Sequence, residues 1–156
     1  MSRLWSFAAT GATPYFDDVE AALYSNANGR VRFRDGKTGT IRFVFNVQNV
    51  RDLASVRHLH VTFRDAGRLP DRGRVDAVLK KVNVTSGNID NVVSISSDSV
   101  TAEPDQFRTA KSVSLPDDEI PLNDESHYYY IVVTLERNNA ETQNPTVLGV
   151  SLNAGV

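Results

Sequence analysis

Residues 128–136 read YYYIVVTLE, a run rich in aromatic and β-branched side chains. Such residues favour extended strands, in which successive side chains point to opposite faces. Apolar side chains occupy both odd and even positions of this run, so both faces of the strand are apolar. A strand of this kind is typical of the centre of a sheet, or of a strand whose outer face is covered. The stretch therefore predicts a central β-strand.

The neighbouring sequence repeats the strand pattern with apolar residues at every second position. In residues 40–47, Ile41, Phe43, Phe45 and Val47 share one face, and residues 58–63 alternate in the same way. Further strands are predicted at 4–8, 21–25, 30–34, 75–84, 93–95, 112–115 and 146–153. In residues 75–84 the apolar set changes phase at Lys80 and Lys81, which predicts a bulge or a bend.

Turn-forming Asn, Asp and Gly residues separate these runs, which follow one another roughly every 10–15 residues. Regularly spaced strands without long helical periodicity predict an all-β sandwich with jelly-roll topology and about 8–10 strands. Residues 17–24 offer one short helix as an alternative to a strand. The length of 156 residues fits a single β-sandwich domain spanning residues 1–156.

Composition excludes several classes of protein. Lys plus Arg is 17 and Asp plus Glu is 19, giving a net charge of −2, which argues against a nucleic-acid partner. Cysteine is absent, which removes disulfides, zinc–thiolate sites and thiol catalysis. No apolar run reaches the roughly 18–20 residues of a transmembrane helix, and residues 1–7 do not form a signal peptide. We expect synthesis in the cytosol and no membrane partner, while the final localisation stays open.

Four segments together carry a resemblance to a known group of domains. They are Trp5-Ser6-Phe7, the glycine-bounded run 36–41, the run 128–137 and the closing run 145–152. This succession resembles jelly-roll domains of uncharacterised bacterial proteins and of phage structural proteins, which are similar to lectin-like sandwiches. The resemblance implies a jelly-roll fold and a role in binding or assembly. It assigns no catalytic residue.

Three histidines are candidate metal ligands. His58 and His60 stand two residues apart on a predicted strand, so both rings project from one face about 7 Å apart. His127 opens the tyrosine-rich strand and supplies a third imidazole if that strand is a neighbour. Three histidines would suit zinc. The alternative is that His58 and His60 lie on a solvent-facing strand beside Arg57, whose charge disfavours a cation.

Acidic side chains gather at Asp117, Asp118 and Glu119, just before Ile120 and Pro121. Oxygen-rich loops bind calcium when they supply six to eight ligands, yet this run lacks the spacing of an EF-hand. The alternative is a turn whose carboxylates are solvated.

Tyrosine side chains form the third candidate site. Tyr128 and Tyr130 share one face of their strand, and Tyr129 takes the other. Exposed tyrosines in a row stack on sugars or anchor a protein interface. The alternative is that both faces of the strand are covered by the core and by another subunit.

These observations lead to one main functional hypothesis and two alternatives. Motifs of hydrolases, nucleotide-binding loops and zinc proteases are absent, so we expect no enzymatic activity and no cofactor. The apolar strand 128–135, together with the flanking strand 146–152, favours a structural protein that self-associates into a homo-oligomer, as in a virion decoration or fibre component or a bacterial surface-assembly subunit. The first alternative is a carbohydrate-binding module, with or without calcium, whose partner is a glycan. The second is a cupin-like metal enzyme using His58, His60 and His127.

Overall fold

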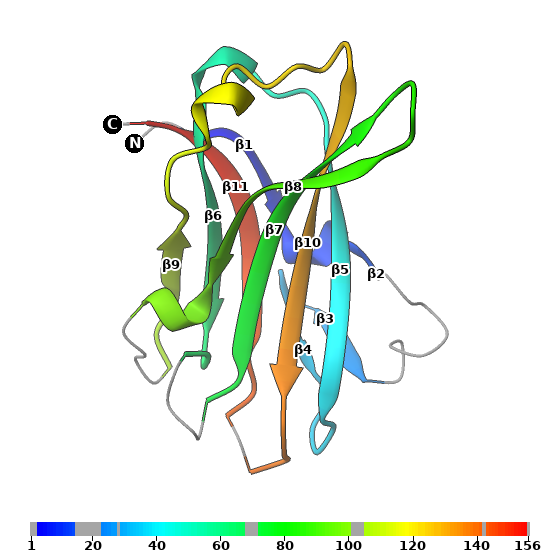
Figure 1. Ribbon diagram of the computed structural model, residues 1–156. Coiled ribbons are helices and arrows are strands. Elements are labelled where there is room, and N and C mark those ends of the chain that lie inside the picture. Colours follow the sequence, from blue (N-terminus) through cyan, green and yellow to red (C-terminus); the bar gives the residue numbers. More distant parts are fainter. Residues whose placement is uncertain are drawn as a thin grey trace.

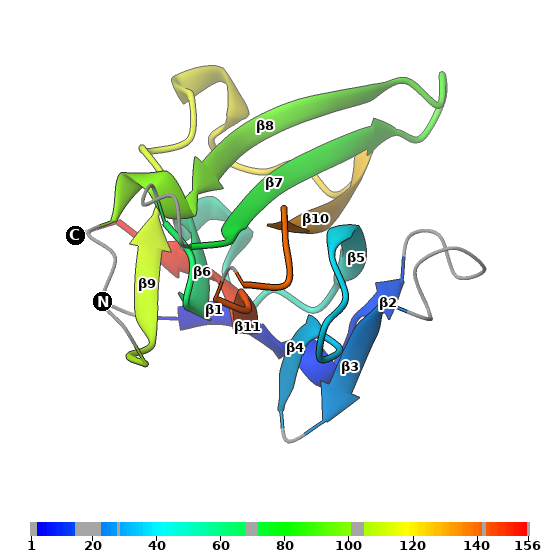
Figure 2. The ribbon, with the colours of Figure 1, turned by 90° about the horizontal axis from the view of Figure 1, so that it is seen from below.

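The computed structural model describes residues 3–14, 23–27, 29–67, 72–100, 105–141 and 143–155. Within these ranges the chain forms eleven strands, arranged as two antiparallel sheets that lie face to face (Figure 1, Figure 2). The strands are β1 (Arg3–Ala8), β2 (Thr13–Pro14), β3 (Tyr24–Ala27), β4 (Arg30–Phe33), β5 (Gly39–Val47), β6 (Val56–Arg64), β7 (Arg74–Asn83), β8 (Ile89–Ser96), β9 (Arg108–Lys111), β10 (His127–Arg137) and β11 (Thr146–Ala154). Four single-turn 3₁₀ helices connect them: η1 (Ala9–Gly11), η2 (Leu53–Ser55), η3 (Ser97–Ser99) and η4 (Asp117–Glu119).

The strand order confirms the jelly-roll β-sandwich. Sheet A has the order β3-β4-β11-β6-β9, with β1 also paired to β11, and sheet B has the order β2-β5-β10-β7-β8. Among the described strands, only β3–β4 and β7–β8 pair as neighbours in sequence. Every other pair therefore joins strands that the chain reaches by crossing between layers.

Strand β10 occupies the centre of sheet B, between β5 and β7, as its sequence predicts. Its inward residues Tyr129, Ile131, Val133 and Leu135 are buried in the core between the sheets. Its outward residues alternate with them, and Val132 is the one apolar aliphatic residue among them. Val132 is covered on the outer face because Val44 of β5 and Val78 of β7 stand directly beside it. In the middle of the outer face, Val44, Val132 and Val78 therefore form one aliphatic row across three strands.

The predicted phase change at Lys80 and Lys81 falls at a real irregularity, but on the partner strand. The register between β7 and β8 shifts after Leu79, because Val92 of β8 is an extra residue. Strand β7 itself pairs with β10 without interruption. Lys81 consequently faces inward at the end of the sandwich, and Val82 faces outward.

Two other predicted elements are displaced. The predicted strand at 112–115 is replaced by β9, which ends at Lys111. The Ser112 hydroxyl accepts the amide hydrogen of Leu59 at 3.0 Å, in the place of a backbone carbonyl, so the regular ladder stops there. The strand predicted at 21–25 appears as β3, three residues later at its start. The alternative helix at 17–24 lies mostly outside the described residues.

Strand β1 lies along β11 and brings the two ends of the chain together (Figure 1). Arg3 pairs with Asn153, and Ala8 pairs with Gly149. The approach at Gly149 is close, because a Cβ atom there would lie 2.6 Å from the carbonyl oxygen of Phe7. A glycine is thus needed at this position for β1 to dock.

In the described part of the chain, no helix has the length and apolar character needed to cross a membrane.

Candidate functional site

The outward face of sheet B around β10 carries both tyrosines that the sequence singles out. We call this surface the tyrosine face and define it by Asn46, Lys80, Val82, Tyr128 and Tyr130, which the strand register places side by side. Tyr129 points to the opposite side, into the core, as predicted from the alternation of side chains.

Tyr128 is the most exposed aromatic group of this face. Its side chain is 68% exposed, and it stands opposite Val82 of β7. Val82 in turn pairs with Ile89 of β8, which is 56% exposed. This end of the sheet therefore presents an apolar row, whose first member is a tyrosine ring with a free face.

The next row along the strands is polar. Tyr130 stands between Asn46 of β5 and Lys80 of β7. The Lys80 ammonium group donates a hydrogen bond of 2.8 Å to the side-chain oxygen of Asn91 on β8. Amide and ammonium groups thus flank the aromatic row on the solvent side.

A hollow of about 320 Å³ opens beside Tyr128, at the end of the sandwich. Its polar lining comes from Gln48, Asn49, Asp124 and His127, and its apolar lining comes from Val47, Val50, Leu53 and Tyr129. We call it the end hollow. The sequence analysis does not single out Gln48 and Asn49. Asn49 adopts a φ of 56°, and an asparagine directly after a strand is the available signal for such a turn.

A hydrogen-bonded turn fixes the far wall of the end hollow. The side-chain oxygen of Asn123 accepts hydrogen bonds from the amides of Glu125 and Ser126, at 3.0 and 3.2 Å. The amide of Asn123 donates to the hydroxyl oxygen of Tyr129 at 2.9 Å. Burial raises the pKa of Tyr129, so its phenol stays neutral. The buried side of β10 therefore holds the loop that carries Asp124 and leads into His127.

The acidic cluster does not form a calcium site. Glu119 is bound to Lys81, and both side chains are largely shielded from solvent. This hydrogen bond is the first cause of the raised pKa of Lys81. Asp117 and Asp118 are exposed. Among the residues that the structure describes, no three acidic or histidine side chains meet in a way that would hold a metal ion.

The predicted three-histidine site is wrong, because the strands place the rings in different sheets. His58 and His60 lie on the outward face of β6 in sheet A, with ring centroids 6.5 Å apart, as their spacing predicts. His127 begins β10 in sheet B, where its Nδ1 lies 2.7 Å from the Ser126 hydroxyl. His58 donates from Nδ1 to the carbonyl oxygen of Ser112 at 3.0 Å. The hypothesis of a cupin-like metal enzyme therefore has no set of three histidine ligands to support it.

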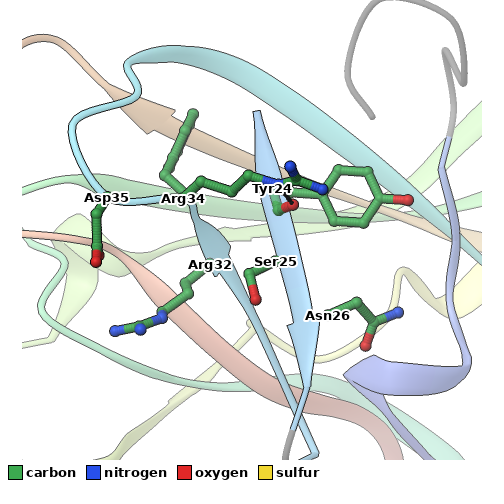
Figure 3. A pocket seen from close by; sticks show the side chains of 7 residues that line it. Tyr24, Ser25, Asn26, Arg32, Arg34 and Asp35 are labelled. Atoms are coloured by element: carbon green, nitrogen blue, oxygen red, sulfur yellow. Dashed lines mark hydrogen bonds between the residues drawn. The ribbon is translucent and has the colours of Figure 1, made fainter. Parts of the chain in front are cut away.

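A larger hollow of about 680 Å³ lies along the β3–β4 hairpin (Figure 3). Its lining includes Tyr24, Ser25, Asn26, Arg32 and Arg34. Arg34 donates from Nε to the carbonyl oxygen of Tyr24 at 2.8 Å. Figure 3 shows that Arg32 and Asn26 point in opposite directions. The side chains do not converge on one point, and the hollow is a poorer candidate than the end hollow.

Comparison with known proteins finds similarity in three-dimensional structure but not in sequence. No protein-family model matches the chain, and no curated protein matches it. Three of the solved structures that it resembles are sugar-binding domains at 11–12% identity. The family 11 carbohydrate-binding module of Clostridium thermocellum, solved with a mixed-linked tetrasaccharide, has a TM-score of 0.46 over 97% of this chain and 89% of its own. The CBM22-2 xylan-binding domain of Paenibacillus barcinonensis Xyn10C gives 0.45 over 96% and 91%. The carbohydrate recognition domain of Emp46p gives 0.49 over 99% and 98%.

The hypothesis of a self-assembling structural protein is wrong. The solved structures named above are carbohydrate-binding domains, and none is described as a virion or assembly protein. The hypothesis rested on an apolar outer face of strand 128–135. In the structure that face carries Tyr128, Tyr130, Thr134 and Glu136, and its one aliphatic residue is covered by neighbours. The fold is an all-β jelly roll of two antiparallel sheets.

Proposed function

We propose that this protein is a non-catalytic carbohydrate-binding domain, and that a glycan lies against Tyr128 and reaches into the end hollow. One observation carries the proposal. A tyrosine ring that is 68% exposed stands directly beside a hollow lined by two amides, a carboxylate and an imidazole.

This combination matches the chemistry of a sugar ring. A sugar has an apolar face of C–H groups and a rim of hydroxyls. The face of an aromatic ring is electron-rich and packs against C–H groups. The amides of Gln48 and Asn49 both donate and accept, the carboxylate of Asp124 accepts, and His127 does either according to its tautomer. A few polar groups beside an apolar surface suffice to orient a ligand.

Replacing Tyr128 with alanine tests the proposal. We expect the Tyr128→Ala variant to bind the recognised neutral glycan at least about tenfold more weakly, because the stacking surface is lost. The ring is exposed, so the unfolding free energy should change by less than about 0.5 kcal/mol. A glycan array identifies the ligand, and titration calorimetry compares the affinities.

The control variant is Val113→Ala, since Val113 is 76% exposed and does not line the end hollow. Its affinity should equal that of the unmodified protein. Equal binding by the Tyr128→Ala variant, or no binding to any neutral glycan on the array, would overturn the proposal.

A further inference from the structure

The outward face of sheet A is polar and positively charged. Strand register aligns its residues in four rows across β1, β4, β11, β6 and β9. We call this surface the basic face. Its rows are Arg3, Asn153 and His58; Ser6, Ser151, His60 and Lys111; Ala8, Gly149, Thr62 and Thr109; and Arg32, Thr146 and Arg64. No Asp or Glu stands in these rows.

Three of the four cations in these rows have no acidic partner in the described part of the chain. Arg64 is held by Asp65, with Nε and the carboxylate oxygen 3.2 Å apart. Within the described ranges, Arg3, Arg32 and Lys111 have no carboxylate at ion-pair distance. Arg3 and Lys111 are both exposed. Lys111 stands beside His60 in the same row, and Arg3 stands beside Asn153 in the adjacent row. An anion on this face would therefore meet two uncompensated positive charges.

A buried polar pair lies between these two cations. The side chains of His60 and Asn153 are 8% and 4% exposed, although both stand on the outward face. The amide nitrogen of Asn153 lies 3.4 Å from Nδ1 of His60. An amide nitrogen can only donate, so Nδ1 accepts and the proton of the neutral ring is on Nε2.

This arrangement leaves one donor and one acceptor open. Among the residues that the structure describes, neither His60 Nε2 nor Asn153 Oδ1 has a hydrogen-bond partner. Buried polar atoms without partners are rare, and such atoms commonly mark a site that a water or a ligand completes. A hydroxyl group suits the pair, because it accepts from Nε2 and donates to Oδ1.

Space for a small ligand lies next to the pair. A hollow of about 290 Å³ has a lining that includes the polar residues Arg3, Ser6, Thr62 and Ser151 and the apolar residues Phe7, Leu148 and Val150. Ser151 is the register partner of His60, and Thr62 follows His60 on the same face of β6. Arg3 and Lys111 lie close enough to His60 for their charges to lower the pKa of its ring. Both are long, exposed side chains whose charged ends stay in solvent, where an anion can reach them.

We propose that the basic face binds an acidic glycan, with a uronate carboxylate between Arg3 and Lys111 and an adjacent sugar hydroxyl on His60 and Asn153. A uronic acid carries a carboxylate and hydroxyls on one ring, which is the combination that these groups require. The site lies on the opposite side of the sandwich from Tyr128, so it goes beyond the proposed function. The two proposals can fail independently.

Aromatic contacts favour an acidic sugar over a nucleic acid. Phe107 lies under the guanidinium groups of Arg30 and Arg64, with the carbon centres 5.2 and 5.1 Å from the ring centroid. Phe7 is stacked on Trp5, with ring centroids 5.9 Å apart. The rings of Phe107 and Phe7 are thus engaged, whereas binding of single-stranded nucleic acid relies on free aromatic faces. Hydroxyls of Ser6, Ser151, Thr62 and Thr109 line the face instead.

The test compares polygalacturonate with the same polymer after methyl esterification. Both polymers present the same ring hydroxyls, and esterification removes the negative charge. We expect the protein to bind polygalacturonate at least about tenfold more tightly than the ester. Binding should weaken as sodium chloride rises from about 50 to about 200 mM, because salt screens exposed charges. Titration calorimetry measures both effects.

Charge reversal locates the site. Lys111→Glu and Arg3→Glu should each weaken binding about tenfold or more, while Lys37→Glu in the turn between β4 and β5 should leave it unchanged. All three side chains are exposed, so the variants should fold. Tyr128→Ala should bind polygalacturonate normally. In NMR spectra, the ring signals of His60 should shift when a galacturonate trimer is added.

Several results would overturn the inference. One is that the protein does not bind polygalacturonate, or binds it no more tightly than the methyl ester. Another is that Lys37→Glu weakens binding as much as Lys111→Glu does. A third is that the ring signals of His60 do not shift when the galacturonate trimer is added. Equally tight binding of single-stranded DNA would show a general polyanion surface, and would also overturn it.

Discussion

At the scale of single residues, His60 shows how a solvent-facing strand position becomes buried by its own neighbours. Burial, followed by the charges of His58, Lys111 and Arg3, lowers the pKa of His60 from 6.5 to about 4. The neutral ring is therefore maintained throughout the physiological range. This fixed protonation state preserves a hydrogen-bond donor at Nε2 in a surface rich in positive charge.

The lowered pKa makes His60 a source of acid sensitivity. Because the folded pKa lies below the unfolded one, the unfolded state takes up the proton first. Stability should be complete above about pH 6.5 and should fall as the pH drops toward about 4. Between about pH 7 and about pH 4.5, we expect the His60→Gln variant to lose about 1–3 kcal/mol less unfolding free energy than the unmodified protein. Urea unfolding at about pH 7 and about pH 4.5 measures it.

The quantity to compare is the change in unfolding free energy between the two pH values, measured for the unmodified protein and for the His60→Gln variant. Carboxylates elsewhere contribute equally to both proteins, so they cancel. An identical loss in the His60→Gln variant would show that His60 titrates normally in the folded state.

At the scale of elements, η4 is attached to sheet B by one ion pair. Lys81 occupies an inward position at the end of β7, where a lysine would be unfavourable without a partner. Glu119 of η4 supplies that partner. The short helix and the strand end therefore stabilise one another across 38 residues of sequence.

Removing the charge of Glu119 should loosen this end of the sandwich. We expect Glu119→Gln to lower the unfolding free energy by about 1–3 kcal/mol, because the Lys81 charge is left without compensation. Asp117→Asn is the matched control in the same turn, since Asp117 is exposed, and should cost less than about 0.5 kcal/mol. Chemical denaturation compares the variants. A smaller loss from Glu119→Gln than from Asp117→Asn would contradict this account.

Strands β10 and β7 show where sequence patterns predict the structure and where they fail. Alternation places Ile131 inward and Tyr128 outward correctly, because side-chain direction in a strand has a strict period of two. The phase change at Lys80 and Lys81 is visible in the sequence, yet the extra residue is Val92 on the neighbouring strand. A pattern within one strand does not show what an adjacent strand or a distant helix supplies. Glu119 is such a distant partner.

The candidate site, too, can be predicted from the sequence only in part. Tyr128 and Tyr130 are recognisable from a single run of sequence. Gln48 and Asn49 join Tyr128 only because β5 and β10 pair in the fold. Residue type alone groups His127 with His58 and His60, and the sheet order separates them.

At the scale of the whole molecule, the edges of both sheets resist pairing with a second copy. Edge strand β2 has two residues and includes Pro14, which lacks an amide hydrogen. Edge strands β3 and β9 have four residues each, and the edge strands β1 and β8 each contain a register shift. Short or irregular edges discourage association through hydrogen bonds.

We therefore expect a monomer in solution. Light scattering at micromolar concentration should give about 17 kDa, the mass of one chain, across a range of protein and salt concentrations. A discrete dimer or trimer that persists on dilution would contradict this expectation. It would also return attention to the row of Val44, Val132 and Val78 on the outer face of sheet B.

The antiparallel pairing of β1 with β11 has a consequence for how this domain can be built into larger polypeptides. Because Arg3 lies opposite Asn153, the chain enters and leaves the sandwich at one place. A host protein could accept the whole domain within a surface loop, since the two splice points need to be separated by little more than the width of two strands. Insertion of this kind would leave the outer faces of both sheets, on opposite sides of the domain, free to contact solvent.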